Sequence, residues 1–473
     1  MKRLLLVLYL GFVAAPAWAD EGRFQDYAVG ARAMGLGGAY AAIADDASGI
    51  FYNPAGLTDV THARLNLSTN LYGVELNGTT PIESAVLRFE SGLSAADFII
   101  LPSSTGVAMG LGRPLPGGGH RHAVAFGTQV PQYTSRLVES FERDPATGRT
   151  TRFLSSLTDR TLHAGAGYAF RAGPWIRVGF AAHYLLRTVD AQESLISRQD
   201  DDARVFFLSE NRLRSTYHSV RGVVGLKVRP GPRLTLGASL TTPTLGLWRT
   251  ASYESAEAAG APDGPAPALD LVRVDHADVD LSSQLPAQLR LGVAFVEPAD
   301  FALSADVIAY APSAYEVVPA EALTGVESRV RQIPIPLKVE RGPLVNGAVG
   351  FEKLLSDELS VAVGLFTNFT SAPELDYDEV TGVLRAGSSR LSRVHMIGGS
   401  FALGFFSEHS LSRLGVTGST GWGKAVLPTA PADRLGTRAN ALRAVDATQT
   451  YLYVFWSSSF RWGEGRGERD FSL

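Results

Sequence analysis

This sequence has no cysteine and, after residue 19, no long apolar run. The absence of cysteine among 473 residues excludes a disulfide framework and thiolate metal sites. No window after residue 19 offers the roughly 18 or more consecutive apolar residues that a membrane-spanning helix needs. The sequence therefore does not predict a helical membrane protein.

Charged residues are also few, at 19%, and the formal net charge is only −4. This balance gives no indication of a nucleic-acid partner or of a polybasic membrane-surface patch. Hydrophobic residues make up 45%, which does not fit a disordered tail. The 49 glycines indicate many turns and tightly packed strands.

Motifs of enzyme chemistry are missing as well. The nine histidines are scattered, and neither HExxH nor GxSxG occurs. The stretch Gly418–Lys424 has the spacing of a phosphate-binding P-loop, but Ala425 replaces the hydroxyl that would hold magnesium. We therefore predict no enzyme activity, no cofactor and no metal site. Asp45 and Asp46 are expected to cap a short helical turn rather than bind a cation.

The first 19 residues have the organisation of a secretion signal. Lys2 and Arg3 form a positive end, residues 4–13 an apolar core, and residues 17–19 an A-x-A cleavage site. We expect the mature protein to begin at Asp20.

Period-two alternation, the pattern of β-strands, dominates the chain after residue 60. From Ile176 to Leu186, apolar residues alternate with a second face that carries Arg177 and His183. The same split recurs in 288–295, where Arg290 lies on the second face, and in 359–369. About fourteen segments have this pattern, each near the roughly 9 to 11 residues of a tilted membrane-spanning strand. They cover residues 62–76, 104–113, 121–130, 160–170, 175–187, 216–228, 232–241, 288–295, 301–310, 343–352, 359–369, 393–405, 409–420 and 448–462.

The face that stays free of charge favours a membrane barrel over a soluble sandwich, and so do aromatic residues near strand ends, which fit interfacial girdles. These aromatics are Trp175, Trp248, Tyr451, Tyr453, Trp456 and Trp462. Residues 229–232 and 297–300 are predicted to be tight turns. Polar segments are predicted to be long extracellular loops at about 190–214, 250–283, 311–341, 371–391 and 424–446. The last strand should end at Phe460 or Trp462, unless Phe471 takes over that role.

The stretch Val29–Leu57 fits neither a strand nor an ordinary helix. Its glycines lie among alanines, a composition that allows close approach of backbone to backbone but supplies little core. Such a segment must pack inside something. Pro54 disfavours the helical conformation for Asn53, so a helical turn should end at Tyr52 or Asn53.

The run GARAMGLGGAYAAIADDAS followed by YNPAGL resembles the N-terminal hatch of the long-chain fatty-acid transporter (FadL/TodX) family of outer-membrane proteins. The likeness includes the family's Asn-Pro-Ala signature at 53–55, and weaker similarity continues in Leu285–Val307 and Phe126–Leu137. It implies an all-β fold with a signal peptide at 1–19, a luminal hatch at 20–57 and a transmembrane antiparallel β-barrel of about 14 strands at 58–473.

The resemblance further implies a monomeric channel in a Gram-negative outer membrane. Its role would be passive uptake of hydrophobic molecules, such as long-chain fatty acids or aromatic hydrocarbons, with no energy source. Its surroundings would be outer-membrane lipid, lipopolysaccharide and the barrel-assembly machinery. In that family, a lateral opening arises from an irregularity in an early strand.

The alternative is a barrel of the same type that binds exported proteins as a scaffold or shuttle at the cell surface. A continuous apolar tunnel would favour transport, whereas a filled, charge-paired lumen would favour the scaffold.

The hatch is a candidate gate whose movement would open a ligand path; alternatively, it only fills the lumen. The gating residues would be Asn53, Pro54, Ala55, Gly35, Gly37 and Gly38.

Inward-facing charges are candidate ligand anchors, because an arginine presents a forked donor suited to a carboxylate. Arg177, His183 or Arg290 would hold a head group, while the apolar tail lies against Met34 and Phe51. The structural alternative is that these charges pair with Asp306 or other acids and stiffen the barrel.

Overall fold

The computed structural model describes residues 22–61, 63–79, 82–83, 88–89, 94–115, 118–144, 148–260, 269–278, 284–317, 338–429 and 441–462. The expected signal peptide and Phe471 lie outside these ranges. Within them, one antiparallel sheet closes on itself, because β1 pairs with β20 on one side and with β4 on the other. The strands are β1 (Ala63–Thr79), β2 (Ile82–Glu83), β3 (Arg88–Phe89), β4 (Ser94–Pro114), β5 (His120–Asp144), β6 (Arg149–Arg171), β7 (Ile176–Gln199), β8 (Phe206–Val228), β9 (Leu234–Thr241), β10 (Leu245–Gly260), β11 (Asp270–Asp278), β12 (Gln288–Glu297), β13 (Phe301–Tyr310), β14 (Ser313–Glu316), β15 (Lys338–Arg341), β16 (Leu344–Ser356), β17 (Leu359–Asn368), β18 (Arg393–Phe406), β19 (Ser410–Thr429) and β20 (Ala441–Trp462).

The barrel has 14 strand positions although its sheet contains sixteen elements. The first part of β8 pairs with β10 and its last part with β9, so β9 and β10 occupy one position. Pro243 separates them, and proline cannot donate to a strand ladder. Likewise β11 pairs with β10 and β12 pairs with β9, so these two share the next position. The predicted fold class is confirmed, and each predicted strand overlaps one of the 14 positions.

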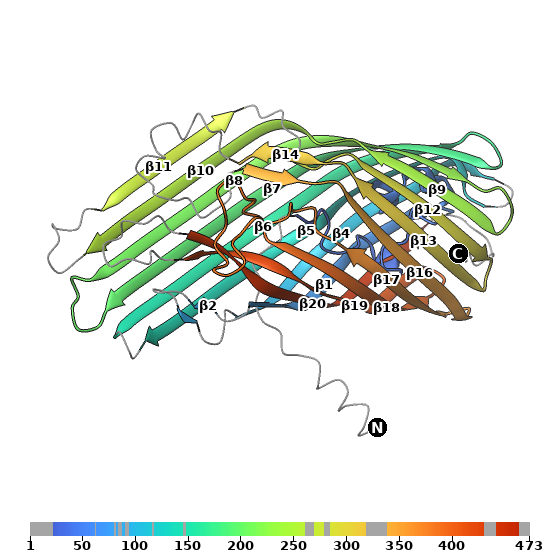
Figure 1. The fold of residues 1–473 in the computed structure, drawn as a ribbon. Coiled ribbons are helices and arrows are strands. Elements are labelled where there is room, and N and C mark those ends of the chain that lie inside the picture. The colour runs from blue at the N-terminus through green and yellow to red at the C-terminus, as the bar shows by residue number, and fades with distance from the viewer. Residues whose placement is uncertain are drawn as a thin grey trace, which may run out of the picture.

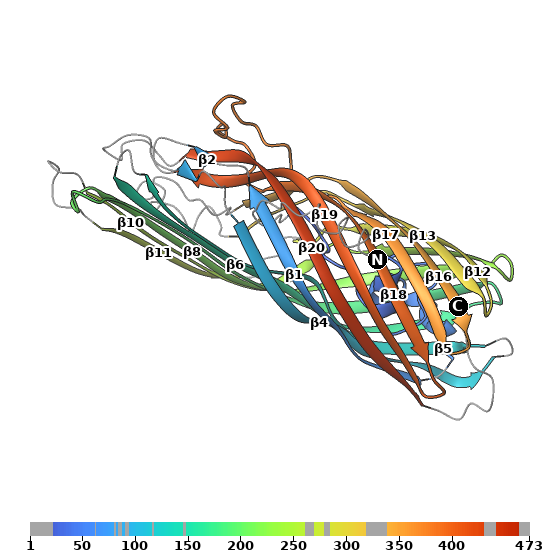
Figure 2. The same ribbon diagram turned by 90° about the horizontal axis from the view of Figure 1, so that it is seen from below.

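The two ends of the barrel differ. One end, called the short-turn end, carries brief connections such as those at 172–175, 229–233 and 298–300. The opposite end, called the long-loop end, carries the longer connections. Strands β5 to β8 have 23 to 25 residues, whereas β12, β13 and β17 have 10 each. One side of the long-loop end therefore projects well beyond the other (Figure 1, Figure 2).

These long strands correct the predicted loops at 190–214 and 250–283. Most of 190–214 continues β7 and β8 as a paired hairpin, and β10 and β11 occupy much of 250–283. Polar side chains such as Ser197, Ser209 and Asn211 are buried on the inward face of this extension, and polarity alone therefore suggested loops.

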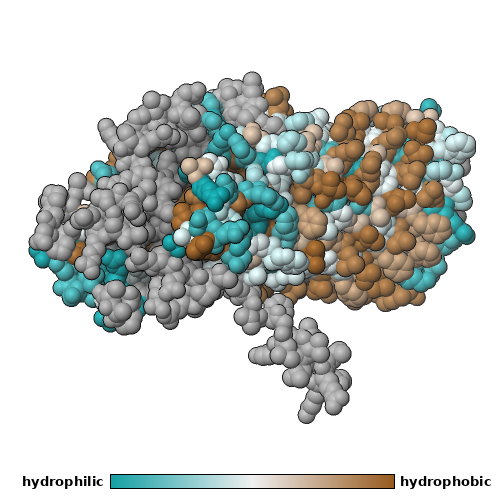
Figure 3. Space-filling view, in the orientation of Figure 1, coloured by the Kyte–Doolittle hydropathy of each residue, from teal (hydrophilic) through white to brown (hydrophobic). Residues whose placement is uncertain are grey.

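Outward-facing side chains form an apolar belt around the short-turn half of the barrel, and Figure 3 shows it as bands of brown. Along β7, Phe180 is 47% exposed while inward Arg177 and His183 are each 2% exposed, as the alternation predicts. Trp175 and Trp456 are exposed, but Tyr451 and Tyr453 are buried in the lumen. The girdle prediction is wrong for these two tyrosines, because their parity along β20 places them on its inward face.

Residues 22–60, called the hatch below, lie inside the short-turn half of the barrel (Figure 1). They form α2 (Ala31–Gly35), α3 (Gly49–Tyr52) and the 3₁₀ helix η1 (Pro54–Asp59). No helix among the described residues is long and apolar enough to cross a bilayer.

Candidate functional site

Inward-facing glycines of the barrel wall make room for the hatch. A Cβ added at Gly364 would lie 2.2 Å from the backbone nitrogen of Gly37, and one added at Gly179 would lie 2.3 Å from the carbonyl carbon of Pro54. Gly37 itself has a φ of 63°, which residues with a side chain rarely adopt. The hatch therefore touches the wall backbone to backbone. The wall glycines that meet it in this way are Gly179, Gly225, Gly237, Gly350 and Gly364.

Two further hatch glycines occupy different surroundings. A Cβ on Gly35 would lie 3.0 Å from the Cβ of Ala402, so this glycine also permits close packing against the wall. Gly38 has a φ of 90°, but a Cβ there would meet nothing closer than 3.8 Å. Glycine is favoured at position 38 by the backbone conformation, not by a lack of space for a side chain.

Asn53 joins the hatch to β8. Its side-chain oxygen accepts a hydrogen bond from the backbone nitrogen of Ala55 (3.1 Å), and its nitrogen donates to the carbonyls of Ala41 (2.9 Å) and Leu226 (3.0 Å). α3 ends at Tyr52 and Asn53 is extended, as the proline predicts. Asn53, Pro54 and Ala55 are all buried. These contacts fix the bend in place, and its role in gating remains a prediction.

Asp45 does not cap a helix as expected. Its carboxylate pairs with Arg32 (2.7 Å) and accepts a hydrogen bond from the hydroxyl of Tyr40 (2.7 Å). The buried guanidinium of Arg32 gives the Asp45 carboxylate a fully charged partner, which a helix terminus does not. Asp46 instead accepts from the backbone nitrogen of Ser48 (2.9 Å), and Ser48 is the N-cap residue of α3.

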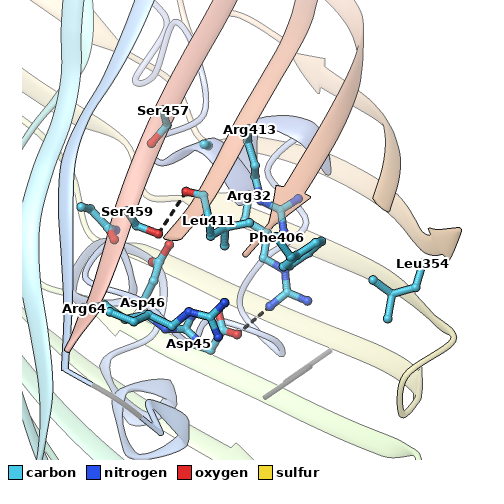
Figure 4. A pocket seen from close by; sticks show the side chains of 13 residues that line it. Arg32, Asp45, Asp46, Arg64, Leu354, Phe406, Leu411, Arg413, Ser457 and Ser459 are labelled. Carbon is cyan, nitrogen blue, oxygen red and sulfur yellow. Dashed lines mark hydrogen bonds and ion pairs between the residues drawn. The ribbon is translucent and has the colours of Figure 1, made fainter. Parts of the chain in front are cut away.

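Arg32 continues this network to the wall. Its Nε lies 2.9 Å from Glu352, which in turn pairs with Arg413 at 2.7 Å. All three side chains are at least nine-tenths buried. Arg32 and Arg413 border a small pocket of about 60 Å³ beside β19 and β20, where Arg32 and Arg64 flank the two aspartates (Figure 4). This side of the hatch is held by ion pairs.

A second ionic anchor lies at the end of η1. Asp59 accepts from Lys227 (2.8 Å) and Arg177 (2.8 Å), and Arg229 lies 3.1 Å away. Burial raises the pKa of Asp59, but the charges of Lys227, Arg229 and Arg177 outweigh burial and hold this pKa below its usual range. The predicted anchor Arg177 is thus engaged with the hatch.

Arg290, on β12, contacts another part of the hatch. It donates to the carbonyl of Gly38 (3.1 Å), pairs with Asp306 (3.3 Å) and stacks on the ring of Tyr52 at 4.8 Å. The pairing with Asp306 is the structural alternative expected from the sequence. Arg290 also lines a cavity of about 50 Å³ together with Met34. The structure thus brings two of the predicted ligand residues together.

His183 and Phe51 form a separate group. Nε2 of His183 lies 3.0 Å from the carbonyl oxygen of Ile50, and its ring contacts His163, which contacts Phe51. The predicted ligand residues therefore do not form one pocket in this structure. Their role in binding stays a prediction.

The wall has a gap in its strand pairing between β4 and β5. These strands pair only from Ser104↔Gln129 to Pro114↔His120. Beyond Ser104, residues 94–102 pair with β1, and residues 132–144 of β5 pair with β6, but the two segments do not pair with each other. The early-strand irregularity that the resemblance implies is present here.

This gap begins where both strands are irregular, since the register of β4 against β1 shifts beside Ser104 and β5 has a bulge after Gln129. Between Gln129 and Gln132, β5 advances three residues while β6 advances two, and Gln129, Val130 and Pro131 are all buried. A bulge bends its strand. The bend brings β5 to the hatch, where Pro131 accepts from the backbone nitrogen of Asp26 (3.0 Å) and Asp26 accepts from that of Tyr133 (3.0 Å).

Apolar side chains lie on both sides of this contact. Ile99, Leu101 and Val130 belong to the same buried cluster as Tyr27 and Met34 of the hatch. A second apolar cluster lies farther toward the long-loop end, among β8, β10, β11, β14 and β15. Its members are Leu213, Tyr217, Ala251, Tyr253, Val272, Val274, Tyr315, Val317, Val339, Ala372 and Leu391.

Sequence reasoning missed the acids that anchor the hatch. Asp59 and Glu352 were not singled out, and Arg32 was not either. Alternation could have indicated Glu352, since it lies on the inward face of β16. Asp59 belongs to no strand, so no periodic signal could have identified it.

Together, the closed sheet, the apolar belt and the filled lumen define a membrane-spanning β-barrel with an internal hatch. No protein-family model and no curated protein matches the sequence. Solved structures do match. A FadL homologue of Pseudomonas aeruginosa is 14% identical with a TM-score of 0.61, and the match covers 93% of this chain and all of that one.

Two toluene transporters are similar as well. TodX of Pseudomonas putida is 13% identical with a TM-score of 0.58, covering 93% of this chain and 99% of that chain. TbuX of Ralstonia pickettii is 13% identical with a TM-score of 0.51, covering 92% and 99%. The chain therefore has the FadL/TodX fold over nearly its whole length, and the sequence resemblance is confirmed at the level of the fold.

Proposed function

We propose that this protein is a monomeric channel of a Gram-negative outer membrane for passive uptake of hydrophobic molecules. Its fold is shared with a FadL homologue and with toluene transporters. Long-chain fatty acids and aromatic hydrocarbons are the two ligand classes to test. The observation that carries the proposal is the gap between β4 and β5, which lies beside the hatch in the membrane-facing wall.

The proposed path has three parts. A hydrophobic molecule first meets the apolar cluster at the long-loop end. It then reaches the hatch where Asp26 bonds to β5. Displacement of these contacts lets it pass between β4 and β5 into the bilayer. Lateral exit is favourable because exposure to water would cost about 0.8 kcal/mol per methylene.

The hydrogen bonds at this contact suit a movable seal. Three bonds join the first hatch residues to β5, including one from the Gln132 side chain to the carbonyl of Arg23 (2.9 Å). A typical hydrogen bond contributes only about 0.5 to 1.5 kcal/mol net. The deeper ion pairs of Arg32 and Asp59 can hold the remainder of the hatch in place meanwhile.

The test is deletion of Pro131, which removes the extra residue of the bulge. Restored pairing with β4 should close the gap and abolish uptake of a labelled long-chain fatty acid and of toluene by cells that lack other uptake channels. Pro131→Ala keeps the residue count and should retain uptake. Uptake at the wild-type rate by a folded deletion variant would contradict lateral transport.

A protein-binding scaffold is the second candidate. The ion pairs Arg32–Glu352, Arg177–Asp59 and Arg290–Asp306 fill the lumen with paired charge, which is the feature expected of a scaffold. Native mass spectrometry of the purified protein separates the two functions. A co-purifying fatty acid or aromatic hydrocarbon supports the channel, whereas a barrel that binds neither after incubation with both ligand classes supports the scaffold.

A further inference from the structure

The membrane-facing wall over β13 and β16 to β20 contains a hollow of about 1030 Å³. It lies within the apolar belt, between exposed side chains such as Leu365, Ile397 and Leu452, which are 70%, 46% and 48% exposed. Figure 3 shows this side of the barrel, where the brown bands lie next to paler surface. The hollow is separate from the gap between β4 and β5.

Missing side chains create the hollow. In one row across the sheet, Leu365 pairs with Gly399, Gly399 with Gly418, and Gly418 with Leu452. In the next row toward the long-loop end, Val307 pairs with Gly347. These three glycines lie on the outward face, since the residues two positions before and after each of them are exposed. Bare backbone therefore forms the floor, and larger side chains form the rim.

Polar groups occupy only one side of the hollow. Thr367, Thr420 and Thr450 line it one row nearer the long-loop end than Leu365 and Leu452. The hydroxyls of Thr420 and Thr450 lie 3.0 Å apart. One hydroxyl proton serves this bond, and the second can be donated to another oxygen. The lining thus changes from apolar to polar toward one membrane surface.

We propose that this hollow is a binding site for an acyl chain of a membrane lipid from the leaflet at the long-loop end. The chain would lie on the glycine floor, and an ester or hydroxyl oxygen would accept from the Thr420–Thr450 pair. Hydrophobicity alone gives no preference for this site, because the bilayer is equally apolar. Close contact with the floor and the hydrogen bond supply the preference, since an unfilled hollow forfeits dispersion contacts. This site is independent of the transport path.

The test uses two outward glycines with equal room for a side chain. A Cβ at Gly347 would meet nothing closer than 3.8 Å, and one at Gly222, on β8, nothing closer than 3.6 Å. Gly347→Leu therefore places a side chain in the hollow without strain, and Gly222→Leu is its matched control on another part of the wall. Each protein is extracted from its membrane in mild detergent, delipidated stepwise and examined by native mass spectrometry.

Wild type and Gly222→Leu should retain one lipid that Gly347→Leu loses, with about a tenfold lower bound fraction, equivalent to about 1.4 kcal/mol. Thr450→Val should lower the fraction about fivefold, as expected for one hydrogen bond. The retained mass distinguishes lipopolysaccharide from phospholipid, and either supports the site. Equal retention by Gly347→Leu and wild type, or no retention by wild type, would overturn it.

Discussion

The hatch meets two walls of the barrel in different ways. Against β16 and β17 it is pressed backbone to backbone, with Gly37 at Gly364. Those strands pair without a break at that level. Against β5 the hatch contact consists of hydrogen bonds to a bulge, beside a gap in the pairing. The first contact can yield only if the wall moves, whereas the second can open by breaking a few bonds. One side of the hatch is therefore fixed and the other releasable.

The largest expected effect comes from the ionic anchor at Asp59, which holds the end of η1 to β7 and β8. Asp59→Asn leaves Lys227 and Arg177 buried without their counter-charge, and loss of one partner of a buried pair costs about 3 to 5 kcal/mol. The free energy of unfolding, measured by urea titration of the refolded barrel, should fall accordingly. Asp200→Asn, which breaks an exposed pair with Arg143, should change the free energy of unfolding little. Equal losses would remove the distinction between anchor and surface pair.

The same anchor predicts a pH dependence. The pKa of Asp59 is lower in the folded barrel than its unfolded value of about 3.9. Its contribution is therefore complete above pH 4 and is lost as the pH falls toward the lower folded value. Unfolding titrations at decreasing pH should show this loss in wild type, and Asp59→Asn should lack that component. Parallel profiles for the two proteins would contradict it.

Gly364→Ala should have the next largest effect. The added methyl group would lie 2.2 Å from the hatch backbone, and overpacking of this kind costs about 1 to 3 kcal/mol. Gly347→Ala on the neighbouring strand points outward into open space and should change stability little. Urea unfolding of both variants measures the difference. Similar stabilities would mean that the hatch does not rest on this wall.

The smallest effect on stability is expected at the releasable side. Asp26→Ala removes the acceptor for the backbone nitrogen of Tyr133, one hydrogen bond worth about 0.5 to 1.5 kcal/mol. The barrel should unfold nearly as wild type does, while amide exchange at Val130, Gln132 and Tyr133 becomes faster. Asp376→Ala, on an exposed segment, is the control and should leave this exchange unchanged. Unchanged exchange in Asp26→Ala would place the flexible contact elsewhere.

Much of the barrel could be predicted because alternation is a local signal. The inward and outward faces of β7 can be predicted from the sequence from Ile176 onward, and Pro54 predicts the end of α3 to within a few residues. The partners of inward charges could not be predicted, because Asp59 meets Lys227, which lies 168 positions later in the chain, beyond β1, β4, β5, β6 and β7. The bulge at Pro131 was also not predicted, since a single extra residue leaves the surrounding alternation almost intact.

The most direct test of the releasable contact is an engineered disulfide, which has no competing thiol because the native chain has no cysteine. The bonds of Asp26 to residues 131 and 133 bracket Gln132, so Asp26→Cys with Gln132→Cys places one thiol on each side of this contact. Uptake of a labelled fatty acid and of toluene is measured before and after reduction. The account predicts no uptake while the disulfide is formed and recovery after reduction, with a double serine variant active throughout. Wild-type uptake by the fully oxidised protein would contradict a hatch that opens at β5.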